Sequence, residues 1–151
     1  MSELETRISF HESPLTRGEQ KLVSAGFEQH SLINNVPQYL KRSIKWLAQD
    51  DHDALQGVAT CNVLWDWLYI DELWVSEASR GQGLGKLLME RIERYAASCR
   101  LQGIWLWTQS WQAEHFYRQL GYCEFTRFDD FPIGHTRIGF RKRLAVRGAD
   151  G

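Results

Sequence analysis

Residues 69–88, YIDELWVSEASRGQGLGKLL, place a strand-like run, a glycine-rich turn and the start of an amphipathic helix in direct succession. The turn is centred on Arg80-Gly81-Gln82-Gly83-Leu84-Gly85-Lys86. Its glycines leave backbone N–H groups uncovered, and the first N–H groups of a helix have no partner within the helix. The helix dipole and the side chains of Arg80 and Lys86 add positive charge. The stretch therefore predicts a site for a phosphate ester or a pyrophosphate.

Two common phosphate-binding motifs do not fit this turn. Neither Ser nor Thr follows Lys86, and no glycine stands in the register that a Walker A loop requires. In a dinucleotide-binding fingerprint, the third glycine would have to stand at Leu87 or Leu88. An ordinary surface loop is the remaining alternative, so the rest of the chain has to decide.

The elements on either side of the turn predict a crossover between parallel strands. From Leu84 to Cys99, apolar residues recur every three or four positions with charged residues mostly opposite them, which predicts a helix. The run 104–108, IWLWT, is apolar without alternation, as in a strand that is buried on both faces. Strand 68–75, this helix and strand 104–108 together predict a right-handed crossover.

The remaining segments predict one mixed α/β domain over residues 1–144. Upstream, we expect a first strand over 6–10, a helix over 15–30, and an antiparallel meander formed by 39–48, 54–65 and 68–75. Downstream, we expect a short helix over 112–119 and a closing hairpin of strands 122–128 and 135–144. The tail, residues 145–151, is expected to be frayed.

Composition excludes several classes of function. The formal net charge of −1, from 18 basic and 19 acidic side chains, gives no overall attraction to nucleic acid or to an anionic membrane. The three cysteines are far apart in the sequence and fit neither a disulfide framework nor a zinc motif, so no metal is expected. No segment has the length or apolarity of a signal peptide or membrane span, which favours a cytoplasmic protein.

Two motifs in this order resemble those of the GNAT superfamily of acetyl-CoA-dependent N-acetyltransferases. Arg80, Gly83 and Gly85 match the family's Arg/Gln-x-x-Gly-x-Gly/Ala turn. The segment 113–122, AEHFYRQLGY, is similar to its Ala-x-x-Phe-Tyr-x-x-x-Gly-Phe/Tyr helix. The resemblance extends from about residue 39 to Leu144. It implies a mostly antiparallel sheet of six or seven strands that splays at two central parallel strands, with helices on both faces.

The resemblance also implies which residues bind acetyl-CoA. Backbone amides from Gln82 to Lys86 would hold the pyrophosphate. Backbone groups of strand residues 73–75 would contact the pantetheine arm and the thioester oxygen. Many relatives have Asn where this chain has Ser110, so that contact to the cofactor or the adjacent loop differs here. The expected cofactor-binding residues are Leu73, Trp74, Val75, Arg80, Gly81, Gln82, Gly83, Leu84, Gly85, Lys86, Ser110, Ala113 and Phe116.

Three side chains are candidates for catalysis. By its place in the motif, Tyr117 would protonate the departing coenzyme A thiolate, although an aromatic residue at this helical spacing could equally pack in the core. Asp71 and Glu72 are candidate bases for the acceptor amine. Because adjacent strand residues point to opposite faces, we expect at most one of the two to face the cleft. A salt bridge at the end of the strand explains either carboxylate as well as catalysis does.

The acceptor is the least determined part of the prediction. Trp65, Trp67, Trp107 and Trp111 could form an aromatic wall for a cationic or flat amine, or could be core residues. Asp129 and Asp130 could attract an amine or form a solvated turn. The expected activity is acetyl transfer to a small-molecule or protein amine, and a homodimer is a candidate assembly. The alternative is a non-catalytic module that senses acyl-CoA.

Overall fold

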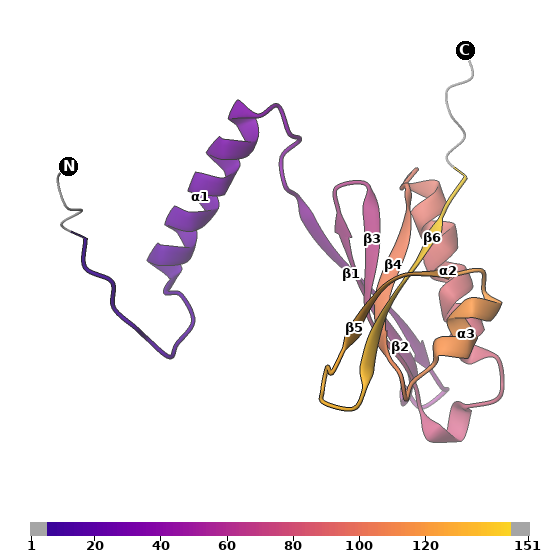
Figure 1. Ribbon diagram of the computed structural model, residues 1–151. Coiled ribbons are helices and arrows are strands. Elements are labelled where there is room, and N and C mark those ends of the chain that lie inside the picture. Colours follow the sequence, from indigo (N-terminus) through magenta and orange to yellow (C-terminus); the bar gives the residue numbers. More distant parts are fainter. Residues whose placement is uncertain (1–5, 146–151) are drawn as a thin grey trace, which may run out of the picture. The chain divides into compact units, whose positions relative to one another are not determined.

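The computed structural model describes residues 6–145, and the chain forms two compact units, Met1–Tyr39 and Leu40–Gly151. Figure 1 shows the elements in chain order, from α1 near the N-terminus to strand β6. The predicted frayed tail lies outside the described residues except for Ala145. A single domain over residues 1–144 stays a prediction, because the two units are described separately.

Helix α1, Arg17–Ile33, is the only regular element of the first unit within the described residues. Its start is set by a capping box: the Thr16 hydroxyl accepts from Glu19 N at 3.2 Å, and the Glu19 carboxylate accepts from Thr16 N at 2.7 Å. The helix predicted over 15–30 is therefore confirmed with shifted ends. The strand predicted over 6–10 is wrong, because those residues form no strand.

A six-stranded sheet in the order β1-β2-β3-β4-β6-β5 forms the second unit. Its elements are β1 Lys41–Gln49, β2 Leu55–Leu64, β3 Trp67–Val75, the 3₁₀ helix η1 Glu77–Ser79, α2 Leu84–Ser98, β4 Gly103–Gln109, α3 Glu114–Gln119, β5 Cys123–Asp129 and β6 Thr136–Arg143. All neighbouring strands are antiparallel except β3 and β4, which are parallel. The predicted mixed fold, meander, crossover and closing hairpin are thus confirmed.

Helices α2 and α3 pack on one face of this sheet, where the core lies (Figure 1). Helix α2 contributes Leu88, Met89, Ile92 and Ala96, all buried, against Leu68, Ile70, Leu106 and other strand residues. The helix predicted from Leu84 to Cys99 is confirmed, although Leu87 on it is 46% exposed. Among the described residues of the second unit, no helix lies on the other face of the sheet (Figure 1).

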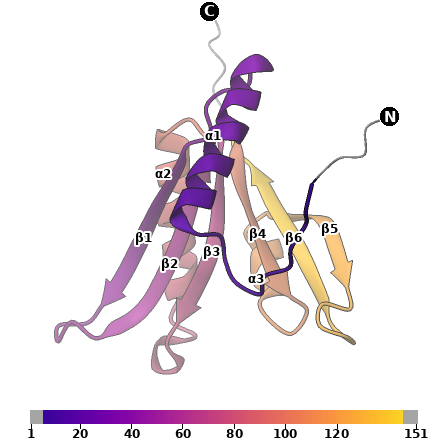
Figure 2. The ribbon, with the colours of Figure 1, turned by 90° about the vertical axis from the view of Figure 1, so that its left-hand side faces the viewer.

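The sheet opens between its two parallel strands. Strands β3 and β4 pair only from Trp67↔Gly103 to Ile70↔Leu106, whereas β3 continues to Val75 and β4 to Gln109. Each strand stays paired with its outer neighbour, β3 with β2 and β4 with β6. Figure 2 shows the two halves of the sheet diverging from the last shared pair. The split leaves one side of the end of β3 without a partner strand.

Strand β3 also contains a β-bulge at the point where the split begins. Cys61 is opposite Ile70 and Thr60 is opposite Glu72, so Asp71 is an extra residue in the ladder. A bulge interrupts the alternation of side chains between the two faces of a strand. The side chains after the bulge therefore point to the opposite faces from those expected for a regular strand.

Among residues 6–145, no helix combines the length and apolarity needed to cross a bilayer.

Candidate active site

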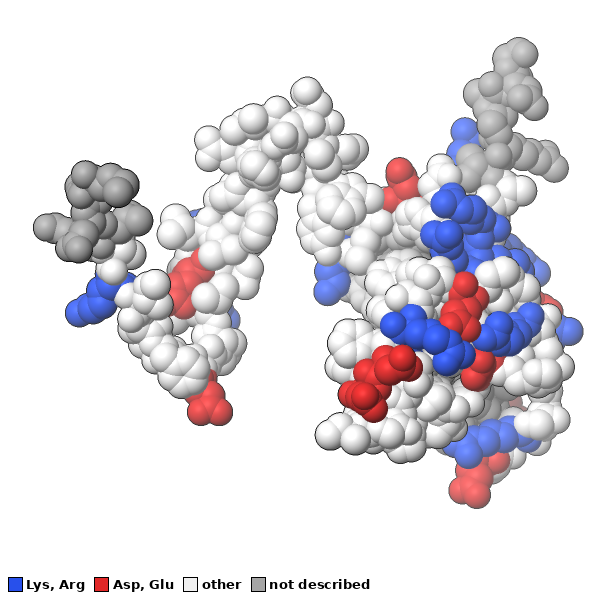
Figure 3. Space-filling view, viewed as in Figure 1, with Lys and Arg blue, Asp and Glu red and all other residues white. Residues whose placement is uncertain are grey.

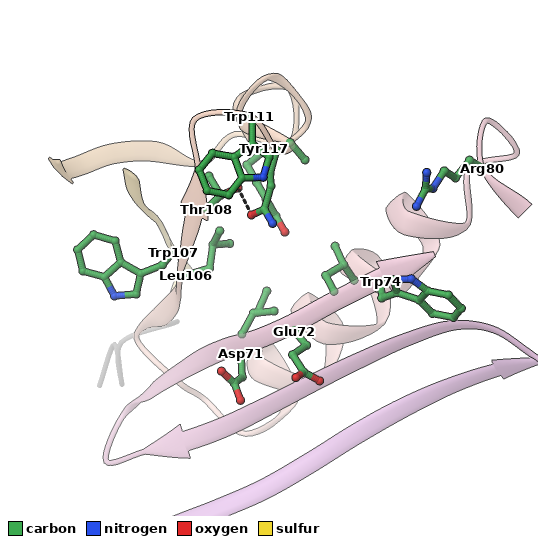
Figure 4. Close-up of a pocket in the computed structure, with 13 residues that line it drawn as sticks. Asp71, Glu72, Trp74, Arg80, Leu106, Trp107, Thr108, Trp111 and Tyr117 are labelled. Atoms are coloured by element: carbon green, nitrogen blue, oxygen red, sulfur yellow. Dashed lines mark hydrogen bonds between the residues drawn. The ribbon is translucent and has the colours of Figure 1, made fainter. Parts of the chain in front are cut away.

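A cavity of about 1030 Å³ lies in the split between β3 and β4. Three segments form its walls: the end of β3, the end of β4, and the loop and helix that follow β4 (Figure 4). The lining residues are Ile70, Asp71, Glu72, Leu73, Trp74, Arg80, Leu106, Trp107, Thr108, Trp111, Gln112, Ala113 and Tyr117. The splayed sheet thus brings together residues that are more than 40 positions apart in the sequence.

A second cavity, of about 360 Å³, lies at the N-terminus of α2. Its lining contains most of the glycine turn together with Val75 of β3 and Phe116 of α3. Arg80 lines both cavities, and its Nε donates to the carbonyl oxygen of Val75 at 3.3 Å. The two cavities therefore adjoin at the end of β3, so one elongated molecule could occupy both.

The glycine turn is shaped to present backbone N–H groups. Gly81 and Gly83 have positive φ angles of 76° and 80°, which glycine adopts without strain. A Cβ atom at either position would meet no protein atom within 4 Å, because both point into open space. Helix α2 has no side-chain cap and no acidic residue in its first turn. Its first N–H groups are therefore available to an anion.

This geometry fits the pyrophosphate of coenzyme A. Lys86 and Arg80 line the cavity beside the helix start, so two cations accompany the helix dipole. Gly85 differs from the other two glycines, because a Cβ atom there would touch Phe116 and Val75 at ordinary distances of 3.5 to 3.8 Å. The backbone N–H groups of the turn could therefore hold the phosphates, because the glycines place no side chains between these groups and the cavity.

The phenol of Tyr117 belongs to a buried side chain in the wall of the large cavity. The side chain is 7% exposed and its ring packs against those of Phe116, Tyr122 and Phe140. Burial, with a smaller contribution from the neighbouring Cys61, raises the pKa of Tyr117 to about 12. The hydroxyl therefore stays protonated at neutral pH and is available as a proton donor. The sequence analysis treated core packing and a place in the cleft as alternatives for Tyr117. The side chain does both, because its ring packs in the core while the residue lines the cavity.

The carboxylates of Asp71 and Glu72 lie side by side on the cavity wall opposite Tyr117 (Figure 4). The expectation that at most one of them faces the cleft is wrong, because the bulge at Asp71 breaks the alternation of the strand. The Thr60 hydroxyl donates to Glu72 at 3.4 Å. Among the described residues, neither carboxylate forms a salt bridge, so the salt-bridge interpretation finds no partner here.

The sequence analysis missed four cavity residues: the apolar Ile70 and Leu106 and the polar Thr108 and Gln112. The Gln112 side chain accepts from the Gln109 N–H at 3.1 Å and from the Thr108 hydroxyl at 3.5 Å. These contacts close the loop after β4 and set the direction in which α3 starts. The available signal was the position of Gln112 immediately before the second motif.

Two of the expected cofactor-binding residues line neither cavity. Gln82 directs its amide to the carbonyl oxygen of Ala78 at 3.4 Å. The Ser110 hydroxyl accepts from Thr136 N at 3.2 Å, and Ser110 N donates to Thr136 O at 2.8 Å. Ser110 therefore ties the end of β4 to β6. Its contact to the cofactor stays a prediction that this geometry does not support.

The predicted aromatic wall is only partly present. Trp107 and Trp111 line the large cavity together with Trp74, whereas Trp65 and Trp67 do not. The Trp107 ring already carries the Arg137 guanidinium at 4.6 Å from its centroid. Asp129 and Asp130 accept hydrogen bonds from Thr136 and Gly134, as expected for a turn.

The comparison with known proteins agrees with the split sheet and the glycine turn. The fold is that of acetyltransferases. The chain belongs to the acetyltransferase (GNAT) family, whose sequence model matches residues 12–122.

Individual relatives support the same class. A blasticidin-S acetyltransferase of Streptomyces morookaense is 37% identical over 87 residues, which cover 57% of this chain and only 64% of that relative. A crystal structure of an acetyltransferase from Bacillus cereus ATCC 14579 superposes with a TM-score of 0.78 at 28% identity, covering 89% of this chain and 98% of that one. A putative streptothricin acetyltransferase from Bacillus anthracis, solved in complex with acetyl coenzyme A, shares the fold with a TM-score of 0.60 at 22% identity over 68% of this chain and 62% of that one.

Proposed function

We propose that this protein transfers the acetyl group of acetyl-CoA to a primary amine by direct attack in a ternary complex. One observation carries the proposal: Tyr117 and the Asp71–Glu72 pair face one another across a single cavity, which adjoins the glycine turn. A donor for the leaving thiolate and an acceptor for the amine proton thus lie on opposite sides of one space. The coenzyme would lie across both cavities with its pyrophosphate at Gly83 to Lys86.

Backbone N–H groups of β3 would stabilise the oxyanion that forms when the amine attacks the thioester. Ser76, which follows β3, donates its N–H to the carbonyl oxygen of Gln56 in β2 at 2.8 Å. Because N–H directions alternate along a strand, those of Leu73 and Val75 point away from β2, into the split. A fixed donor at the developing oxyanion contributes about 2.7–4 kcal/mol to transition-state stabilisation.

The proton balance of the reaction uses both walls of the cavity. The acceptor ammonium loses a proton to Asp71 or Glu72, and the free amine forms a bond to the carbonyl carbon. The C–S bond then breaks, the nitrogen releases its second proton to solvent, and the Tyr117 hydroxyl donates its proton to the sulfur. The products are an acetamide and coenzyme A thiol, and solvent returns the proton to the phenolate. Which of the two carboxylates accepts the proton stays open, because both face the cavity.

Release of free thiol from acetyl-CoA in the presence of a panel of primary amines tests the proposal. We expect amine-dependent thiol release, and we expect acetyl-CoA and coenzyme A, but not ATP, to raise the melting temperature. Thermal stabilisation by acetyl-CoA without thiol release across the panel would instead favour the acyl-CoA sensor.

A further inference from the structure

A second group of charged side chains adjoins the proposed catalytic carboxylates on the face of the sheet that α2 and α3 leave open. It lines a cavity of about 450 Å³ formed by β1, β2 and β3. Its polar lining consists of Lys41, Ser43 and Lys45 on β1, Thr60 and Asn62 on β2, and Asp71 and Glu72 on β3. Because both carboxylates also line the large cavity, they form the boundary between the two spaces.

The strand register arranges these charges by sign. Lys45 is opposite Thr60 and Thr60 is opposite Glu72, so the three lie in one row across the sheet. Neighbouring strands are about 4.8 Å apart, which separates the backbones of β1 and β3 by about 10 Å. Two positive charges therefore stand on one strand and two negative charges on another, with neutral polar residues between them.

The opposite charges do not pair directly. Among the described residues, no salt bridge within 4.0 Å joins Lys41 or Lys45 to either carboxylate. The cavity is thus neutral in sum but has a positive end and a negative end. Charge complementarity then favours a molecule with the same separation of charges over a molecule of one sign. A polyamine would meet the lysines at one end and be repelled there.

We propose that the acceptor is a zwitterionic small molecule, which carries a primary amine and a carboxylate. This inference rests on the proposed function. The amine lies at Asp71 and Glu72, within reach of the thioester in the split. The carboxylate lies over β1, where Lys45 is its main partner and Lys41 a second, with hydroxyl and amide groups of β2 beneath it. Lys45 is then a specificity-determining residue of the reaction.

A matched series of acceptors separates this inference from simple amine acetylation. The probes are 6-aminohexanoate, hexylamine and 1,6-diaminohexane, which share the chain length and the reacting amine but differ at the far end. We expect kcat/KM to be highest for the amino acid and lowest for the diamine. Lys45→Met should lower kcat/KM for 6-aminohexanoate by about 10- to 100-fold, as for loss of a charged hydrogen bond, and leave hexylamine unchanged.

Two further variants sharpen the test. Lys45→Arg should restore most of the activity toward 6-aminohexanoate, whereas Lys45→Glu should shift the preference toward the diamine. Arg42→Met is the matched control, because it removes a positive charge from the same strand on the opposite face, where Arg42 lies over the Tyr95 ring at 5.9 Å. It should leave the preference for the carboxylate intact.

The outcomes distinguish this inference from the proposed function. Equal rates for 6-aminohexanoate and hexylamine, or equal losses for both in Lys45→Met, would overturn the inference while acetyl transfer itself stood. If acetyl-CoA bound but no member of the series were acetylated, the proposed function would fall and the inference with it.

Discussion

At the scale of single residues, the account depends on the protonated phenol of Tyr117. Its burial against Phe140 and Tyr122 raises its pKa to about 12, which keeps the hydroxyl available as a donor at every pH at which the protein is expected to work. The turnover rate should therefore rise with pH as the acceptor amine loses its proton. It should show no decline from Tyr117 below about pH 10.

Replacement of the tyrosine tests this role directly. We expect Tyr117→Phe to lower kcat by about 100- to 10,000-fold, the usual contribution of general acid–base catalysis, with little change in acetyl-CoA affinity. Steady-state kinetics and calorimetric titration measure the two quantities separately. Tyr122→Phe is the control, because its hydroxyl donates to Glu93 at 3.1 Å and lines no part of the large cavity. Equal kcat values for the two variants would remove Tyr117 from the mechanism.

Site residues that belong to a short local motif could be predicted from the sequence. The orientation of site residues that depends on strand register could not. The glycine turn and Tyr117 lie within short motifs, so their placement follows from sequence order. The shared orientation of Asp71 and Glu72 comes from one extra residue in the pairing of β3 with β2. No residue type near Asp71 signals that bulge, since Asp and Glu are both unremarkable at a strand end.

At the scale of elements, the glycine turn and the end of β3 form the binding surface for the coenzyme. Gly83 caps α2 with a left-handed conformation and has open space beside it. Gly134, in the turn between β5 and β6, has nearly the same φ, 83° against 80°, and also has nothing within 4 Å of a Cβ atom. A residue with a Cβ atom would thus be similarly strained at the two positions, which differ in their position relative to the cavity.

This pair supplies a matched experiment. Leucine in a left-handed conformation costs about 1–2 kcal/mol, so Gly83→Leu and Gly134→Leu should lose similar amounts of stability. Only Gly83→Leu should also lose the rise in melting temperature caused by acetyl-CoA, because its side chain would occupy the cavity at the helix start. Retention of that rise in Gly83→Leu would place the pyrophosphate elsewhere.

Elements with a clear pattern in their own residues were predicted, whereas the one strand that was wrongly predicted has no partner strand among the described residues. Helix α2 and strand β4 carry their patterns within their own residues. The strand predicted over 6–10 has suitable apolar residues, Ile8 and Phe10, but a strand is stable only when paired, and pairing is not a local property. The capping box of Thr16 and Glu19 was present in the sequence and sets the start of α1 at Arg17.

At the scale of the whole molecule, the exposed charged side chains and the buried ionisable side chains contribute differently to stability. Acidic and basic side chains are interspersed over the face of the second unit shown in Figure 3. Arg118 and Arg127 form salt bridges with Glu114 and Glu124. These exposed pairs contribute little to stability. The buried ionisable groups matter more, because burial raises the pKa of Cys61 to about 12 and that of Tyr122 above its usual value.

These shifts predict a loss of stability at alkaline pH. Folded Cys61 and Tyr117 hold protons that the unfolded chain releases above pH 9.0 and 10.0, their unperturbed pKa values. The unfolded state then binds fewer protons, so the free energy of unfolding falls as pH rises, by up to about 1.4 kcal/mol per pH unit for each group. Urea unfolding between pH 8 and 10.5 should show the fall. Cys61→Ala should reduce the slope of the free energy of unfolding against pH between pH 9 and 10. An unchanged slope there would contradict the contribution assigned to Cys61.

The central claim is that acetyl-CoA and a primary amine meet in the split of the sheet. The most direct test is mass spectrometry of each amine in the panel after incubation with acetyl-CoA, together with the free thiol released. The account predicts an N-acetylated amine formed in equal amount to coenzyme A, and neither product above background in Tyr117→Phe. Acetyl-CoA binding without any acetylated amine, or acetylation that Tyr117→Phe leaves unchanged, would contradict it.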